Sequence, residues 1–183
     1  MTQRTPAGPE IWIRGPVGSA AAPAETSTGF PQPVPGTGLT APAAVAHPSS
    51  FSWMNAHGGA GATTLATVFG GNDAGSQWPD PAAGASGEVL LVARTHASGL
   101  RAVSQVLDMI RRNEQPSGVI LKAVVLVADA PGRLPPELAK RIKVIGSVVE
   151  VHRVPWTPAW RMGDLSGPVP RETSKLSKLI NSR

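Results

Sequence analysis

The fold of this chain is decided by residues 51–64, which read Phe51-Ser52-Trp53-Met54-Asn55-Ala56-His57-Gly58-Gly59-Ala60-Gly61-Ala62-Thr63-Thr64. The first five residues are mostly apolar and predict a short buried strand. Glycines follow, and after them come residues compatible with a helix. A strand, a glycine-rich turn and a helix form the layout of a phosphate-binding loop. In such a loop, backbone N–H groups converge on phosphate oxygens at the positive end of the helix dipole.

Downstream of this stretch, predicted strands and helices alternate along the chain. Residues 118–128 form a long apolar run that only Lys122 interrupts, which is typical of a strand covered on both faces. Strands are predicted at residues 51–55, 88–93, 118–128 and 148–151, helices at 62–66, 100–112 and 135–142, and a loop over 70–87. This alternation predicts an α/β fold with a small, mostly parallel sheet and helices on both of its faces.

The composition divides the chain into three parts. Residues 1–49 hold nine of the 19 prolines and predict a disordered leader rich in Pro, Ala and Gly. Within it, residues 10–14 read Glu-Ile-Trp-Ile-Arg and suit either a short docking strand or an apolar spot in a disordered tail. Residues 50–166 form the predicted α/β domain. Residues 167–183 form a predicted basic tail, with a short helix at 175–183.

Several classes of protein are excluded by what the sequence lacks. There is no cysteine, so neither a disulfide framework nor a thiolate metal site can form. No run of about 18 apolar residues is present, which argues against a transmembrane segment. The N-terminus lacks the apolar core of a secretory signal, so we expect a cytoplasmic protein.

The charge is concentrated near the C-terminus. Residues 1–139 carry eight Lys and Arg against nine Asp and Glu, whereas residues 140–183 carry nine against three. This basic C-terminal quarter could contact DNA or another acidic surface, although a solvated basic surface is equally consistent with it.

The glycine turn resembles the deviant Walker motif K-G-G-x-G-K-[ST] of the ParA/MinD family of ATPases. The resemblance extends over about residues 50–166, where the segment Val154-Pro155-Trp156 is similar to the border of that family's adenine pocket. It implies a reduced P-loop NTPase-like fold that binds ATP and Mg²⁺. The residues that it implies for binding the phosphates or other parts of the nucleotide are His57, Gly58, Gly59, Ala60, Gly61, Ala62, Thr63, Thr64 and Pro155. The motifs H-G-G-A-G-A-T-T, V-A-R-T, V-A-D-A-P-G and V-P-W-x-x-A-W-R together also resemble an uncharacterised family of actinobacterial proteins, which implies no function.

Both lysines of the Walker motif are replaced, by His57 and Ala62. The second lysine supplies charge to the terminal phosphates, and phosphoryl transfer depends on such electrostatics. We therefore expect hydrolysis to be weak or absent. Mg²⁺ would be held by Thr63 and by Asp129, which is also the one candidate catalytic carboxylate. Asp129 can equally be a turn residue before Pro-Gly.

Three functions follow from these patterns. The first is a non-catalytic or weakly catalytic ParA/MinD-like adaptor or regulatory protein that has a protein partner in a partition, conjugation or secretion system. The second is an active ATPase in which His57, Thr63 and Asp129 compensate for the lost lysines. The third is a DNA-associated accessory protein that uses the basic C-terminal quarter.

Overall fold

The computed structural model describes residues 50–182. The predicted leader, with its docking strand near residues 10–14, lies outside the described residues. The described part is an α/β domain, as the alternating pattern predicted.

The sheet has five strands, and every pair of neighbours is parallel. Its strands are β1 (Ser52–Asn55), β2 (Asn72–Asp73), β3 (Glu88–Arg94), β4 (Ile120–Val127) and β5 (Val151–Val154). They lie in the order β2-β1-β3-β4-β5. Because all strands run the same way, their carboxyl ends meet at one edge of the sheet, which places the ends of β1, β3 and β4 side by side.

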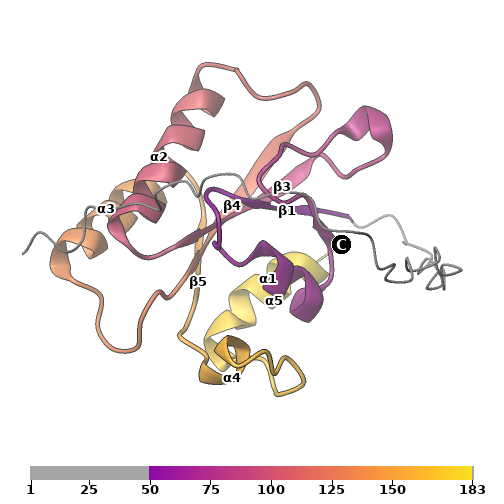
Figure 1. The fold of residues 1–183 in the computed structure, drawn as a ribbon. Helices are drawn as coiled ribbons and strands as arrows, with labels where there is room; N and C mark the ends of the chain where they lie inside the picture. Colours follow the sequence, from indigo (N-terminus) through magenta and orange to yellow (C-terminus); the bar gives the residue numbers. More distant parts are fainter. Residues whose placement is uncertain (1–49, 183) are drawn as a thin grey trace, which may run out of the picture. The chain divides into compact units, whose positions relative to one another are not determined.

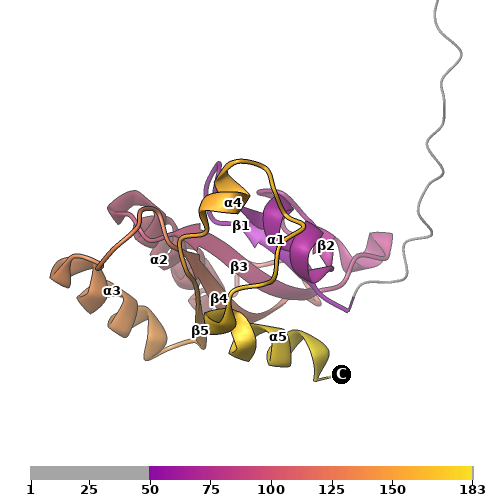
Figure 2. The same cartoon turned by 90° about the horizontal axis from the view of Figure 1, so that it is seen from below.

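Helices cover both faces of this sheet, as Figures 1 and 2 show. The helices are α1 (Ala62–Phe69), α2 (Ala97–Arg111), α3 (Pro136–Gly146), α4 (Pro158–Arg161) and α5 (Ser174–Asn181), with single 3-10 turns at Pro81–Ala83 and Arg171–Thr173. Helices α1 and α5 pack on one face and α2 and α3 on the other. The short helix α4 follows β5 at the carboxyl edge.

Two hydrophobic clusters hold these layers together, one on each face of the sheet. Successive residues of β3 alternate between them: Leu90 and Val92 pack with α1 and α5, whereas Val89 and Leu91 pack with α2 and α3. This alternation is the period of two that strand geometry imposes. Both sets are buried because both faces are covered, which explains the continuous apolar run of β4.

The structure differs from the sequence prediction at four places, the last of which is the short helix α4, which was not predicted. Strand β2 lies within the predicted loop 70–87. The strand predicted to begin at Val148 begins only at Val151, as β5, and Val148 itself is 72% exposed. The third difference is the C-terminal boundary. Leu176 on α5 is 1% exposed and belongs to the core cluster on the α1 face. We therefore place the end of the domain beyond α5 instead of at residue 166.

Candidate functional site

The glycine-rich turn joins β1 to α1 at the carboxyl edge of the sheet. Gly59 has a φ of 73° and Gly61, which precedes the first residue of α1, has a φ of 113°. Residues that carry a Cβ atom rarely adopt such positive φ angles, so glycine is required at both positions. A Cβ atom added to Gly58, Gly59 or Gly61 would meet no atom within 4 Å. The space above the loop is therefore open.

The loop also offers hydrogen-bond donors. Within residues 50–182, the following amides donate no hydrogen bond: Gly58, Gly59, Gly61, Thr63 and Thr64. Unpaired amides at the start of a helix attract anions, because they carry the positive end of the helix dipole. The loop thus presents five unpaired backbone donors to an anion.

Ala62, which stands where the Walker motif has its second lysine, is built into the core. Its side chain is completely buried in the cluster under α1, and its amide donates to Asn55 Oδ1 at 3.0 Å. A lysine is almost never fully buried without a partner. A lysine side chain could therefore not occupy the space that the Ala62 methyl fills.

His57 serves as a link between the loop and β3. Its Nε2 accepts a hydrogen bond from the Arg94 amide at 3.0 Å, and its Nδ1 lies 2.9 Å from the Gly58 carbonyl oxygen. Since a carbonyl can only accept, this pattern assigns the neutral tautomer with hydrogen on Nδ1. Both ring nitrogens are thus used within the protein. His57 positions the loop and supplies no free cation.

Thr63 pairs with a carboxylate that the sequence analysis did not identify. Its hydroxyl donates to Asp73 Oδ2 at 2.6 Å, while Asp73 Oδ1 accepts from the Gly75 amide at 2.9 Å. Asp73 ends β2, the neighbour of β1. This pair could not be predicted from the sequence, because β2 has only two residues and both are polar.

Asp129 lies elsewhere along the same edge. It follows β4, which is separated from β1 by β3. Its amide donates to Thr95 Oγ1 at 3.1 Å, and its carbonyl oxygen accepts from Arg161 at 3.3 Å. Thr63 lies in the first turn of α1, after β1, whereas Asp129 follows β4, and the carboxylate that hydrogen-bonds to Thr63 is Asp73.

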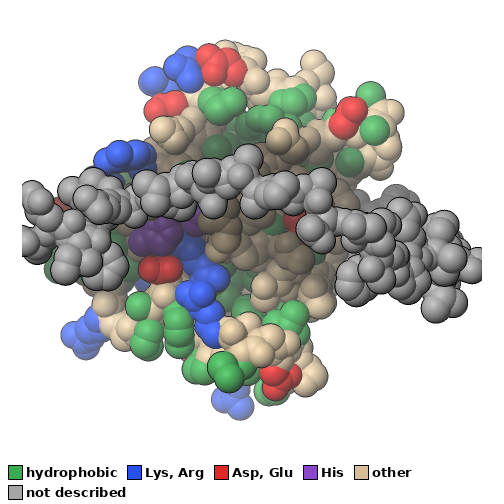
Figure 3. Space-filling view, in the orientation of Figure 1, with side chains coloured by type: hydrophobic (Ala, Val, Ile, Leu, Met, Phe, Trp, Pro, Cys, Tyr) green, Lys and Arg blue, Asp and Glu red, His purple; other side chains and the backbone are tan. Residues whose placement is uncertain are grey.

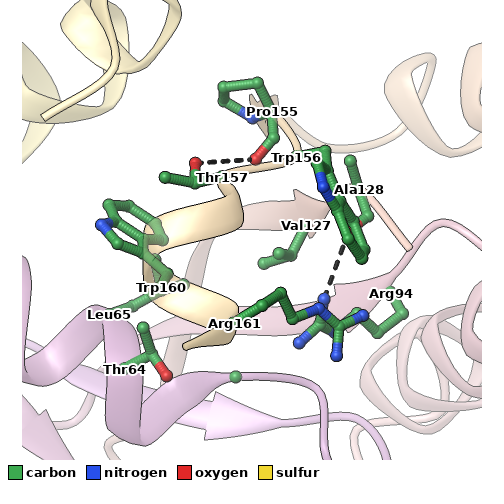
Figure 4. A pocket seen from close by; sticks show the side chains of 11 residues that line it. Thr64, Leu65, Arg94, Val127, Ala128, Pro155, Trp156, Thr157, Trp160 and Arg161 are labelled. Atoms are coloured by element: carbon green, nitrogen blue, oxygen red, sulfur yellow. Dashed lines mark hydrogen bonds between the residues drawn. The ribbon is translucent and has the colours of Figure 1, made fainter. Parts of the chain in front are cut away.

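A cavity opens beside the loop, and Gly61 and Pro155 both line it (Figure 4). Its walls come from the loop and α1, the ends of β3 and β4, and the segment through α4. Its larger lining side chains are those of Arg94, Trp156, Trp160 and Arg161. Its volume is about 40 Å³. A larger hollow of about 510 Å³ adjoins it and shares Ala128, Pro155 and Trp156 with its lining.

Two arginines face this cavity. Arg94 donates from Nε to the Gly59 carbonyl at 3.3 Å and from Nη1 to the Ala128 carbonyl at 3.2 Å. Burial lowers the pKa of Arg94, the nearby Arg161 guanidinium lowers it further, and Asp129 raises it. Arg161 also stacks on Trp156, with the guanidinium carbon 4.6 Å from the ring centre. The space-filling view shows histidine, basic and acidic side chains gathered near the middle of this face (Figure 3).

The groups at this edge fit Mg²⁺ and phosphate to a limited extent. Mg²⁺ prefers oxygen ligands and is commonly held by one or two carboxylates together with substrate phosphates. Thr63 and Asp73 provide one hydroxyl and one carboxylate next to the open amides. Within residues 50–182, no group of three or more His, Cys, Asp or Glu side chains could hold a metal ion alone. Any Mg²⁺ here would thus have to arrive with its phosphate.

The chain belongs to a family of unknown function (DUF6668), whose model matches residues 50–180. The match covers the whole sheet and nearly all of α5, in agreement with the domain boundary that the packing indicates. No curated protein and no solved structure matches the chain. Within the described residues, none of the helices has the length and apolar character needed to cross a membrane.

Proposed function

We propose that this is a cytoplasmic, ParA/MinD-like binding protein that holds the phosphates of a ligand at its glycine loop and hydrolyses them weakly or not at all. One observation carries the proposal: a glycine loop with unpaired amides opens beside a cavity that two arginines line. Thr63 and Asp73 would hold the Mg²⁺ that accompanies the phosphates. When bound, this ion would offset part of the phosphate charge.

The same geometry argues against an efficient ATPase. Ala62 is buried, and both ring nitrogens of His57 are engaged within the protein. Neither Ala62 nor His57 can therefore supply the positive charge that the two Walker lysines bring to the phosphates. Asp129 is not on a strand next to β1, so it cannot approach Thr63 as a carboxylate on a neighbouring strand would.

Binding without turnover suits an adaptor or regulatory protein, since the ligand can then control a partner for as long as it stays bound. A role for that partner in partition, conjugation or secretion rests on the resemblance of the glycine loop to ParA/MinD alone.

The distribution of basic side chains does not favour the alternative of a DNA-associated protein. Lys140, Arg141 and Lys143 are exposed on α3, which covers one face of the sheet. Lys175 and Lys178 are exposed on α5, which covers the other face. These five basic side chains are thus divided between the two faces of the sheet.

The test is a calorimetric titration of the full chain with ATP, with and without Mg²⁺, together with a measurement of released phosphate. We expect saturable binding that Mg²⁺ strengthens, and little phosphate release. The variant Asp73→Asn should lose the effect of Mg²⁺, because it removes the carboxylate beside Thr63. The matched variant Asp129→Asn should keep it.

Two results would count against the proposal. If ATP did not bind either with or without Mg²⁺, the proposal that the glycine loop holds the phosphates of ATP would be contradicted. Rapid phosphate release that disappears in Asp129→Ala would establish the ATPase instead.

A further inference from the structure

Arg94 and Arg161 reach the same cavity from distant parts of the chain. Arg94 is the last residue of β3, and Arg161 is the last residue of α4. The two guanidiniums are close enough for Arg161 to lower the pKa of Arg94. Two like charges in a partly buried cavity repel each other, and the cost of holding them together falls when an anion binds.

Neither guanidinium is neutralised by a direct ion pair. Among residues 50–182, the salt bridges involve other side chains, and the partners of these two arginines are backbone carbonyls and the ring of Trp156. Carbonyl oxygens orient a guanidinium but leave its full charge. Planar N–H donors of this kind match phosphate oxygens well.

Arg94 is also tied directly to the glycine loop. Its side chain donates to the Gly59 carbonyl, and its own amide is the group that His57 accepts from. Arg94 thus brings positive charge to the loop from a neighbouring strand, at a site where the loop's own lysine is absent. Arg161 adds a second charge from α4.

We infer that Arg94 and Arg161 replace the loop lysine as the cationic groups of the site, and that they select a phosphate chain without regard to the base attached to it. This inference rests on the proposed function, because it assigns the ligand class and the binding residues of the same loop. The groups gathered there support it: the unpaired loop amides and the two guanidiniums are donors that match phosphate oxygens.

The experiment is a titration of the full chain with sodium tripolyphosphate and, separately, with ATP, at constant ionic strength. Binding is followed by calorimetry and by tryptophan fluorescence, since Trp156 lies under Arg161. Tripolyphosphate should bind with an affinity similar to that of ATP. Arg161→Gln should weaken tripolyphosphate binding about tenfold or more, as expected for the loss of one charge-assisted contact.

Arg141→Gln is the matched control, because it removes the same charge from an exposed position on α3. It should leave the affinity unchanged. A purely structural role for Arg161 would instead lower the stability of the ligand-free protein. We expect Arg161→Gln to leave that stability unchanged or higher, because a repulsion is relieved. Arg94→Lys provides a second variant that keeps the charge but loses the two-carbonyl geometry, and its affinity should fall.

The outcomes separate this inference from the proposed function. If the wild type binds tripolyphosphate and Arg161→Gln binds it equally well, the arginine assignment is overturned while the phosphate site stands. If ATP binds and tripolyphosphate does not, recognition through the phosphates alone is overturned. If neither ligand binds the wild type, both the inference and the proposed function fall.

Discussion

At the scale of single residues, the loop glycines differ in what they require. Gly61 has a left-handed φ of 113°, whereas Gly58 lies outside that region and has open space around it. The two positions are three residues apart in the same turn. They therefore separate the effect of backbone conformation from the effect of added volume.

We expect Gly61→Ala to lower the free energy of unfolding by about 1–2 kcal/mol, the usual cost of a left-handed conformation for a residue with a Cβ. Gly58→Ala should change it by less than about 0.5 kcal/mol, as is usual at sites without a special conformation. Urea unfolding followed by circular dichroism measures both. Equal losses in the two variants would show that the loop does not hold Gly61 in this conformation.

The residues of the site were predictable to different degrees. The glycine loop could be identified from its order of strand, glycines and threonines. Arg94 carried a signal as well, since it directly follows the strand predicted at 88–93 and the carboxyl ends of parallel strands meet at one edge. Asp73 could not be found, because its strand is two polar residues long and is defined only by pairing with β1.

At the scale of secondary-structure elements, β5 contains a buried titratable group. His152 is 5% exposed and faces the α5 side of the sheet, as Val154 does. Its Nε2 lies 3.2 Å from a Glu150 carboxylate oxygen but without the alignment of a hydrogen bond. Burial lowers the pKa of His152, Glu150 raises it, and Lys175 on α5 lowers it.

This depressed pKa predicts how stability changes with pH. Near and below the ordinary histidine pKa of about 6.5, the unfolded chain binds a proton that the folded chain resists. The free energy of unfolding should therefore fall as the pH drops from 7.5 to 5.5. In His152→Gln this fall should be smaller, because the titrating group is gone. The measurement is urea unfolding at both pH values.

A decrease of the same size in wild type and His152→Gln would mean that other groups set the pH dependence. Comparing the decreases, not the absolute stabilities, corrects for any packing that the substitution itself disturbs.

The elements themselves were largely predictable from hydrophobic pattern. The long apolar strands and the amphipathic α2 follow directly from their periodicity. Two elements were missed, β2 and α4, because a two-residue strand and a four-residue helix are too short to show a period. Helix α5 was expected, but its packing on the sheet depends on contacts with residues far away in the chain.

At the scale of the whole molecule, the parallel sheet explains why one edge carries the site. The chain crosses this edge after every strand, and each crossing contributes a group: the glycine loop after β1, Asp73 at β2, Arg94 at β3, Asp129 after β4 and Pro155 after β5. Such edges are where ligands bind in parallel α/β folds. The net charge of +5 does not determine where the site lies, since the exposed lysines and arginine of α3 and the lysines of α5 lie on opposite faces of the sheet.

The most direct test of the central claim is to observe the loop amides while phosphate is added. In ¹H–¹⁵N correlation spectra of the full chain, sodium tripolyphosphate should shift the amide signals of Gly59, Gly61 and Thr63, while the signals of α3 stay in place. This result is expected because the loop donors are unpaired and would then gain acceptors. Unchanged loop signals at concentrations that perturb other parts of the protein would contradict the account.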